Sequence, residues 1–300
     1  MLIVTWLGLL ATGTAHADRV VQPSRIESPR GVALGSGVRA AAASTQAQAD
    51  NPANLVVGGV YHIESFFAYD PTFKRYGTGV SVVDAMTSRL AAGMSFRALF
   101  GSNDAGKNEG WEAKLGLGLP IGDMISIGIA GRYANFRIAD THAKPEHPVM
   151  EGQPADRRFH LEAFTMDAAI TLRPVPGFAL SALAYNMIDT DSPLAPLVVG
   201  GSGAFSSAGL TVGGDFLWDL NKQDLFPGPV VVIGGGIEYL ASGMAPIRIG
   251  YQYDQGRDQN FITGGLGFVN PRFGAQVSLR QTVSGPGETS LFFGVQYFVQ

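Results

Sequence analysis

Apolar and polar residues alternate along most of this chain, from residue 55 to the last residue. In residues 125–130, for example, Ile125, Ile127 and Ile129 alternate with serine, glycine and alanine. Because successive side chains of a β-strand point to opposite faces, a period of two gives each segment one apolar and one polar face. The pattern predicts fourteen strands, at residues 55–69, 76–86, 88–100, 111–119, 124–138, 159–173, 178–189, 194–205, 209–220, 229–240, 246–253, 260–269, 272–282 and 288–299.

A soluble β-sandwich would show similar alternation, but the connections favour a membrane barrel. Short turns at residues 120–123, 174–177, 206–208 and 270–271 alternate with longer connections at residues 101–110, 139–158, 221–228 and 284–287. Tight periplasmic turns that alternate with longer extracellular loops are typical of outer-membrane barrels, and an even number of strands places both chain ends on the periplasmic side. We therefore predict an all-β fold, a transmembrane antiparallel up-and-down β-barrel of about 14 strands, in the bacterial outer membrane.

Composition agrees with this fold. After residue 17 no apolar run approaches the roughly 20 residues that a membrane-spanning helix needs, although 46% of the residues are hydrophobic. The 40 glycines and 10% aromatic residues suit many strands with close turns. A net charge of -4 offers no basic face for nucleic acid. Because the chain has no cysteine, we expect neither disulfides nor a lipoprotein anchor.

The first 54 residues do not follow the strand pattern. Residues 1–10 are mostly apolar and precede Ala15-His16-Ala17, a small-x-small cleavage site, so residues 1–17 are predicted to be a secretory signal peptide. The alternative is a buried N-terminal helix. Residues 18–54 are polar, rich in alanine and free of alternation. We expect them to lie inside or beneath the barrel as a hatch or plug, with the barrel itself formed by residues 55–300.

Two motifs in this segment, together with the last strand, resemble known families. The motifs are Ser28-Pro29-Arg30-Gly31-Val32-Ala33-Leu34-Gly35-Ser36-Gly37 and Asp50-Asn51-Pro52-Ala53-Asn54. The second motif lies directly before the first predicted strand, and the last strand, at residues 291–298, is rich in aromatic residues. Together these features resemble the FadL-like and PorV/PorQ-like families of outer-membrane β-barrels.

The resemblance implies a role for the N-terminal segment. In the FadL-like family this segment is a hatch that plugs the lumen, and its movement opens a route for hydrophobic substrates. The residues to which this gating role transfers are Arg30, Gly31, Gly35, Gly37, Asn51, Pro52 and Ala53. Their types suit it, because proline keeps the preceding residue extended and glycine allows close backbone packing and positive φ. The simpler interpretation is that Asn51 and Pro52 only turn the chain into the first strand.

Three functions remain open at this stage. The first is passive transport or binding of small hydrophobic, fatty-acid-like molecules through a hatch-controlled lumen. The second is a PorV/PorQ-like component or shuttle of a protein-secretion system, and the third is a structural barrel without transport. The expected partners are accordingly outer-membrane lipid and either a hydrophobic small molecule or a secretion-machinery protein. The longest loop, residues 139–158, is polar and interrupted by prolines, so we do not expect an apolar capture groove on it.

Charged residues at positions opposite the apolar series of their strands are predicted to face the lumen. They are Arg97, Glu112, Lys114, Arg132, Asp167, Asp215, Asp219, Glu238, Arg248, Asp254 and Arg280. An ion-pair network that fixes the plug is the simpler interpretation, because unpaired charges in a narrow lumen are costly. A selective polar path is the alternative, since rings of charge set pore selectivity.

The sequence offers little support for catalysis. Four metal-capable residues lie in the loop 139–158, namely His142, Glu146, His147 and Glu151, but no regular spacing places them on one face, so we favour a solvated loop. His62 and His160 are the strand histidines that could serve a hydrolase. The glycine run 234–236 opens no helix and indicates close backbone packing rather than a dinucleotide site. We expect no enzymatic activity, no metal and no cofactor.

Overall fold

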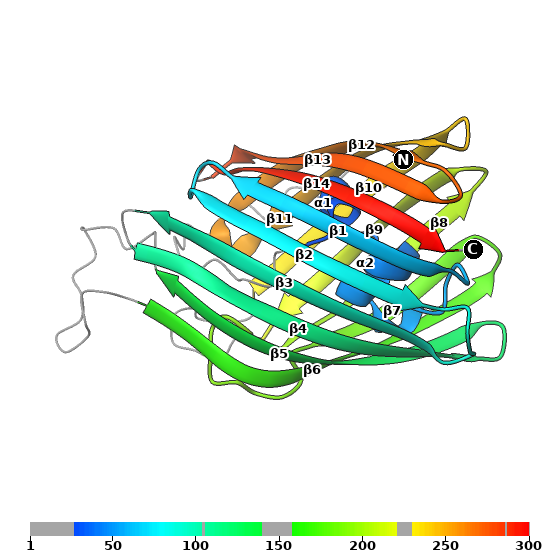
Figure 1. Ribbon diagram of the computed structural model, residues 1–300, viewed down its shortest axis with the longest axis horizontal. Coiled ribbons are helices and arrows are strands. Elements are labelled where there is room, and N and C mark those ends of the chain that lie inside the picture. Colours follow the sequence, from blue (N-terminus) through cyan, green and yellow to red (C-terminus); the bar gives the residue numbers. More distant parts are fainter. Residues whose placement is uncertain (1–26, 104–105, 140–157, 221–229, 286, 300) are drawn as a thin grey trace, which may run out of the picture.

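The computed structural model describes residues 27–103, 106–139, 158–220, 230–285 and 287–299. Within these residues the chain forms fourteen antiparallel strands, each paired with its neighbours in sequence, and β14 pairs with β1 to close the barrel (Figure 1). The strands are β1 Tyr61–Asp70, β2 Arg75–Asp84, β3 Ala91–Asn103, β4 Gly106–Ile121, β5 Ile125–Ala139, β6 Arg158–Val175, β7 Phe178–Tyr185, β8 Val198–Ser207, β9 Leu210–Asp219, β10 Val230–Ala241, β11 Ala245–Asp254, β12 Gln259–Val269, β13 Phe273–Ser284 and β14 Thr289–Val299. The predicted fold class is therefore confirmed.

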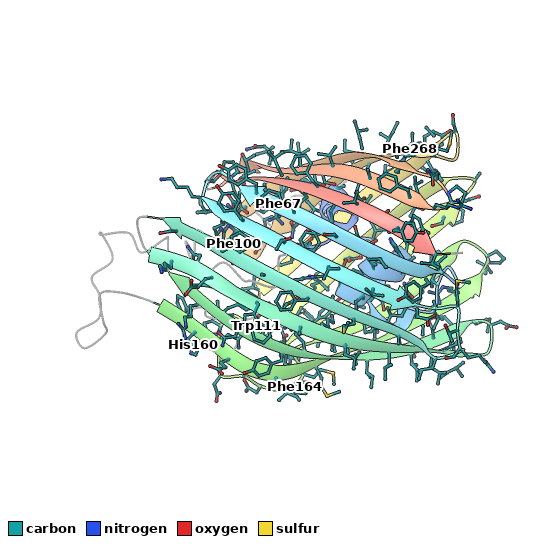
Figure 2. All side chains as sticks on the ribbon, in the orientation of Figure 1. Phe67, Phe100, Trp111, His160, Phe164 and Phe268 are labelled. Carbon is teal, nitrogen blue, oxygen red and sulfur yellow. The ribbon has the colours of Figure 1, made fainter. Side chains whose placement is uncertain are left out.

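The two faces of the wall differ in polarity. Phe67, Trp111, Phe164 and Phe268 project outward, with Phe67 42% and Phe164 50% exposed (Figure 2). Alternate positions face the lumen, and many of these are buried polar residues such as Asp167. An apolar outer surface suits contact with lipid. Among the described residues, no helix has the length and apolar character needed to cross a membrane.

Between β6 and β9 the connections alternate in length. Residues 176–177 join β6 to β7 and residues 208–209 join β8 to β9, whereas residues 186–197 join β7 to β8. In outer-membrane barrels the end with tight turns faces the periplasm. β14 also ends on this side (Figure 1). The opposite end, which carries the longer connections, is called the extracellular end below.

The first strand begins later than predicted, at Tyr61 rather than at residue 55. Gly58 and Gly59 have φ angles of +99° and +53°, a region that side-chain-bearing residues rarely adopt, so the chain turns here instead of extending. Leu55 is fully buried beside Val83, inside the barrel. These residues therefore continue the lumen-filling segment.

The seventh and eighth strands are shorter than predicted. β7 ends at Tyr185 rather than at residue 189, because Asn186 leaves the extended region with a φ of +56°. β8 begins at Val198 rather than at residue 194. Pro193 and Pro196 lack the N–H groups that a strand ladder requires. The apolar residues beside these prolines fold into the lumen instead.

The fourth strand is longer than predicted, and the third strand begins and ends three residues later than predicted. Residues 101–110 were expected to form a connection, but β3 and β4 pair as far as Asn103 and Gly106. Because the backbone makes the ladder, a polar and glycine-rich stretch can continue a hairpin without an apolar face. Most of the predicted connections 139–158 and 221–228 lies outside the described residues.

The described part of the N-terminal segment folds into four short helical elements inside the barrel (Figure 1). They are α1 Pro29–Ala33, η2 Arg39–Ala41, α2 Ser44–Asp50 and η3 Pro52–Asn54. α1 begins where the Ser28 hydroxyl accepts a hydrogen bond from the Gly31 amide at 3.1 Å, with proline at the first helical position. The predicted signal peptide, residues 1–17, lies outside the described residues.

Candidate functional site

Residues 27–54, called the hatch for their position, cross the lumen and contact opposite sides of the wall. α1 packs against β12 and β13, and η2 packs against β8. α2 packs against β1, β2 and β3, while η3 packs against β4, β5 and β6. The lumen is therefore occupied by the chain's own N-terminal segment.

Glycines in the first half of the hatch pack against glycines of the wall. A Cβ atom on Gly35 would lie 2.3 Å from the carbonyl oxygen of Tyr251. A Cβ atom on Gly37 would lie 2.6 Å from the carbonyl carbon of Gly234. No real Cβ tolerates such distances, so backbone packs directly on backbone here. The glycine run 234–236 thus marks a close approach to the hatch.

The hatch glycines differ in what they require. Gly35 has a φ of +69°, whereas Gly31 and Gly37 do not adopt positive φ, which corrects part of the expectation for this motif. A Cβ atom on Gly31 would lie 3.2 Å from both the Ser28 hydroxyl and a carboxylate oxygen of Asp50. Gly31 therefore provides room between α1 and α2 rather than an unusual conformation.

Glycines of β4 and β5 contact the later half of the hatch in the same way, and this contact surface is called the glycine seat. A Cβ atom on Gly116 of β4 would lie 2.4 Å from the Gln48 side-chain oxygen. A Cβ atom on Gly128 of β5 would lie 2.2 Å from the Pro52 carbonyl carbon and 2.3 Å from the Ala53 nitrogen. The Asn-Pro-Ala motif therefore rests on wall backbone.

Gly128→Ala should loosen this seat. The new methyl group meets backbone atoms, which cannot rotate away, and overpacking of this kind costs about 1–3 kcal/mol. Hydrogen exchange of residues 48–55, followed by mass spectrometry, should therefore accelerate by about 5- to 150-fold. Gly264→Ala is the matched control, because a Cβ there has an ordinary 3.6 Å contact. Equal exchange rates of residues 48–55 in the two variants would contradict the claim that Gly128 holds this part of the hatch.

An ion-pair cluster ties α1 to the wall. Arg30 Nη2 lies 2.8 Å from Glu238 Oε1, and Arg30 Nε donates to Glu238 Oε2 at 3.0 Å. Arg248 Nε approaches the same carboxylate at 2.5 Å. Burial alone would lower the pKa of Arg30, but the Glu238 carboxylate outweighs it and the pKa is raised, so the guanidinium stays charged.

A second ion pair ties η2 to the wall. Arg39 Nη1 lies 2.7 Å from Asp215 Oδ2, and the Arg39 amide donates to Asp215 Oδ1 at 3.1 Å. The Ser202 hydroxyl donates to the same carboxylate and accepts from the Ala40 amide at 2.7 Å. Removing one partner of a buried pair costs about 3–5 kcal/mol, so this contact is a strong anchor.

Asparagine side chains hold η2 from the other side. Asn51 Nδ2 donates to the Arg39 carbonyl at 3.0 Å and to the Ser181 hydroxyl at 3.1 Å. Asn54 Nδ2 donates to the Ala40 carbonyl at 2.9 Å. Asn51 therefore does more than turn the chain into β1. It connects two parts of the hatch to each other and to the wall.

Hydroxyl groups of the wall bind backbone groups of the hatch. The residues that carry these hydroxyl groups were not predicted from the sequence. Thr263 Oγ1 accepts from the Gly35 amide and donates to the Ala33 carbonyl, both at 3.0 Å. Ser278 Oγ donates to the Pro29 carbonyl at 2.7 Å. Inward-facing Ser and Thr are common on barrel strands. The available signal for Thr263 was its position before Gly264 and Gly265, whereas no glycine stands next to Ser278 in the sequence.

The predicted lumen charges lie on the inner face, and most form wall-to-wall or hatch-to-wall pairs. The wall pairs are Arg97–Glu112 at 3.7 Å, Arg132–Glu112 at 3.4 Å, Lys114–Asp167 at 2.7 Å, Arg248–Glu238 at 2.5 Å and Arg280–Glu288 at 3.4 Å. Asp254 instead caps η4, Gln255–Arg257, by accepting from the Arg257 amide at 3.3 Å. Asp219 is buried. This pairing favours the interpretation of an ion-pair network.

A cavity of about 120 Å³, called the chamber, lies between hatch and wall. Arg39 and Asp50 line it from the hatch. The paired Lys114 and Asp167 line one part of the wall, and apolar residues such as Leu217 line another. Burial raises the pKa of the Asp50 carboxyl above its ordinary value, although Arg39 opposes this shift.

A second cavity, of about 500 Å³, lies toward the tight-turn end and is called the lower cavity. Ala40, Ala41 and Ala42 line it from the hatch. Phe178 and Ser206 of the wall line it near the turns. The chamber and the lower cavity thus meet the hatch at consecutive residues, and the single turn η2 lies where they adjoin.

Residues 186–197, called the inner loop, fold into the extracellular half of the lumen. Leu194 is 1% exposed and belongs to a buried apolar cluster with Phe66, Phe136 and Leu161. The Asn186 amide donates to Asp167 at 3.0 Å, and the Met187 amide donates to the Met166 carbonyl at 2.8 Å. Because Asn186 also lines the chamber, the inner loop forms part of its roof.

His62 and His160 are the candidate chemical residues that the structure describes, and they lie on opposite faces of the wall. His62 Nδ1 lies 2.6 Å from the Ser44 hydroxyl of α2, and the His62 ring stacks on Phe298. This contact helps to seat α2. His160 lies on the outer face beside Glu162. No group of three or more metal-binding side chains occurs in the described part of the chain, and residues 142–151 lie outside it.

These features define an outer-membrane-type β-barrel whose lumen is filled by its own N-terminal segment. The fold is similar to that of the Ralstonia pickettii toluene transporter TbuX, with a TM-score of 0.62 and 13% identity over 91% of this chain and 98% of that chain. It is also similar to a Pseudomonas aeruginosa FadL homologue, with a TM-score of 0.60 and 11% identity over 91% and 98%. The P. putida toluene transporter TodX gives a TM-score of 0.57 and 11% identity over the same shares.

The fold is therefore FadL-like, as the resemblance in sequence implied. The sequence matches no protein-family model and no curated protein. At these identities the likeness extends to the fold, and function must be argued from the site. The alternative of a secretion-system component gains no support from these structures.

Proposed function

We propose that this protein is a passive channel of the bacterial outer membrane for small hydrophobic molecules, with the hatch as its gate and no chemical step. Molecules enter from the extracellular end, pass the inner loop, rest in the chamber and leave through the lower cavity when the hatch shifts. The concentration gradient drives net uptake. Apolar contacts favour each intermediate position by about 25 cal/mol per Å² of buried apolar surface.

The observation that carries this proposal is the narrowness of the barrier between the two cavities. Arg39 lines the chamber, and the next residue, Ala40, lines the lower cavity. A small displacement of η2 would connect them. The contacts of η2 are specific. They are the ion pair to Asp215, the amide bonds from Asn51 and Asn54, the hydrogen bond from the Ala40 amide to Ser202 and the packing of Ala40 in a small apolar cluster. Such an element can have two arrangements.

The apolar cluster beneath the inner loop supports the proposal that apolar molecules enter here. Phe66, Phe136, Ile138 and Leu161 point inward from the wall, where a purely structural barrel or a water-filled pore would carry polar groups. Leu194 occupies the space among them. The toluene transporters of similar fold suggest the class of molecule. The size of the chamber favours a single ring over a fatty-acid chain.

The combined replacement Asn51→Ala and Asn54→Ala should open the gate. It removes the amide bonds that fix η2, each worth about 1 kcal/mol. It also removes the contacts of these two side chains with Ser181 and Arg173, but it changes no residue of the wall. Proteoliposomes with this variant should take up toluene about tenfold faster than those with wild-type protein, measured by headspace gas chromatography. Heat-modifiable mobility on gels should be unchanged. The exposed-residue variant Arg89→Ala serves as control.

Two results would count against the channel. Toluene uptake by wild-type protein no faster than by protein-free liposomes would refute transport of hydrocarbons. Uptake that is equal in wild type and in the double asparagine variant, with both proteins folded, would refute the gate at η2 while leaving transport intact.

A further inference from the structure

Two buried polar groups facing the chamber have no partner. Gln252 is 3% exposed and Ser36 is 7% exposed, yet neither Gln252 Oε1 nor Ser36 Oγ makes a hydrogen bond within the described residues. Both residues line the chamber. Buried polar atoms are nearly always paired in proteins, so an unpaired set aimed into a cavity indicates a bound hydrogen-bonding group.

Asp50 adds an acceptor to this set. Its carboxylate lines the chamber and forms no hydrogen bond or ion pair with any described residue. The basic residues nearby already have partners, since Lys114 pairs with Asp167 and Arg132 pairs with Glu112. The group that satisfies the chamber is therefore a hydrogen-bond donor. It is not an anion, because no basic residue is left over for it, and burial raises the pKa of Asp50, which weakens the attraction of a cation.

Apolar residues form one part of the remaining lining of the chamber, next to Asp219. Val198, Leu217 and Val232 come from three consecutive strands, β8, β9 and β10, and pack in one apolar cluster. The volume of about 120 Å³ compares with engineered apolar cavities of about 150 Å³ that bind benzene. One six-membered ring with one small substituent matches this space.

We infer that the chamber is a binding site for a neutral single-ring molecule that carries a hydroxyl group, such as phenol. The ring packs against Val198, Leu217 and Val232, and the hydroxyl donates to Asp50 or Gln252. This inference rests on the proposed function and narrows its substrate class from hydrocarbons to hydroxylated aromatics. A plain hydrocarbon would leave the polar groups unpaired, which disfavours it relative to the hydroxylated analogue.

Binding of phenol and toluene to the purified full-length protein tests this inference. Equilibrium dialysis with radiolabelled ligands gives the ratio of the two affinities for wild type, Gln252→Leu and Asp50→Ala. We expect wild type to prefer phenol, and each substitution to reduce that preference by about tenfold, the effect of one hydrogen bond. Gln281→Leu is the matched control, because Gln281 is an exposed residue of β13.

The outcomes separate the two hypotheses. Equal affinity for phenol and toluene in wild type, or a preference that both substitutions leave unchanged, overturns the hydroxyl-binding chamber while the channel for hydrophobic molecules stands. Absence of binding of either ligand, together with absent toluene uptake, overturns the proposed function itself. The Asp50→Ala protein provides a second reading if Gln252→Leu does not fold.

Discussion

Replacement of Arg30 and Arg39 with alanine should release the hatch from the barrel wall without unfolding the barrel. Both guanidinium groups lie in the lumen and pair with carboxylates of the wall, Glu238 and Asp215. Loss of one partner from a buried ion pair costs about 3–5 kcal/mol, because the other charge remains buried. In planar bilayers the double variant should show frequent open-channel events, while wild type stays mostly closed.

The two arginines should not contribute equally. After Arg30→Ala, Glu238 still has Arg248 at 2.5 Å, so its charge remains compensated. After Arg39→Ala, Asp215 keeps only hydrogen bonds from the Ser202 hydroxyl and from the backbone. Arg39→Ala alone should therefore open the channel more often than Arg30→Ala alone. If the two arginines only stabilised the wall, the two single variants would not differ in how often the channel opens.

Arg89→Ala provides the control, since Arg89 is exposed in the connection between β2 and β3. Heat-modifiable mobility on gels should show a folded barrel in all variants. If the double variant is as closed as the Arg89→Ala protein, these ion pairs do not hold the hatch. If the double variant no longer folds, the pairs belong to barrel assembly rather than to gating.

The number and order of strands could be predicted from the sequence because the alternation is a local property. Each strand needs one apolar face toward lipid, so the alternation of apolar and polar residues recurs in every strand of the wall. The predictions were wrong where the backbone, rather than the pattern, decides. Gly58 and Gly59 turn the chain before β1. Pro193 and Pro196 remove ladder donors before β8.

Partners across the lumen could not be predicted in the same way. Arg30 and Glu238 are 208 positions apart, and nothing local in either strand or hatch specifies that they meet. The glycine run 234–236 could be identified as a site of close packing because three glycines in a strand are unusual. A single glycine such as Gly128 gives no such signal, although its contact with Pro52 is tighter.

The inner loop was missed for a related reason. Leu194 was assigned to a strand because apolar residues around it continue the pattern of β8. The pattern cannot distinguish an apolar residue that faces lipid from one that fills the lumen. The tertiary contacts with Phe66 and Phe136 make that distinction. Thus the burial of Leu194 in the extracellular half of the lumen was not visible in the sequence.

Leu194→Ala should detach the inner loop from the lumen and speed the entrance of hydrophobic molecules. Leu194 is fully buried among Phe66, Phe136 and Leu161, and truncation of a buried leucine costs about 2–5 kcal/mol. The loop's other ties are hydrogen bonds at its ends, one hydrogen bond from Ser192 to the His160 carbonyl and the packing of the small side chain of Ala195. The loss therefore falls largely on the docked state of the loop. Limited proteolysis should cleave residues 186–197 at least tenfold faster, since about 1.4 kcal/mol suffices for tenfold, and toluene uptake should rise.

Met187→Ala is the matched control for this prediction. Met187 belongs to the same loop but is 53% exposed, so its truncation removes few lumen contacts and should leave both proteolysis and uptake near wild type. Faster proteolysis without faster uptake would mean that the loop moves but does not limit passage. Equal behaviour of the two variants in both measurements would mean that the apolar cluster does not hold the loop. Only the joint change in Leu194→Ala assigns the loop as the extracellular barrier, in series with η2 below the chamber.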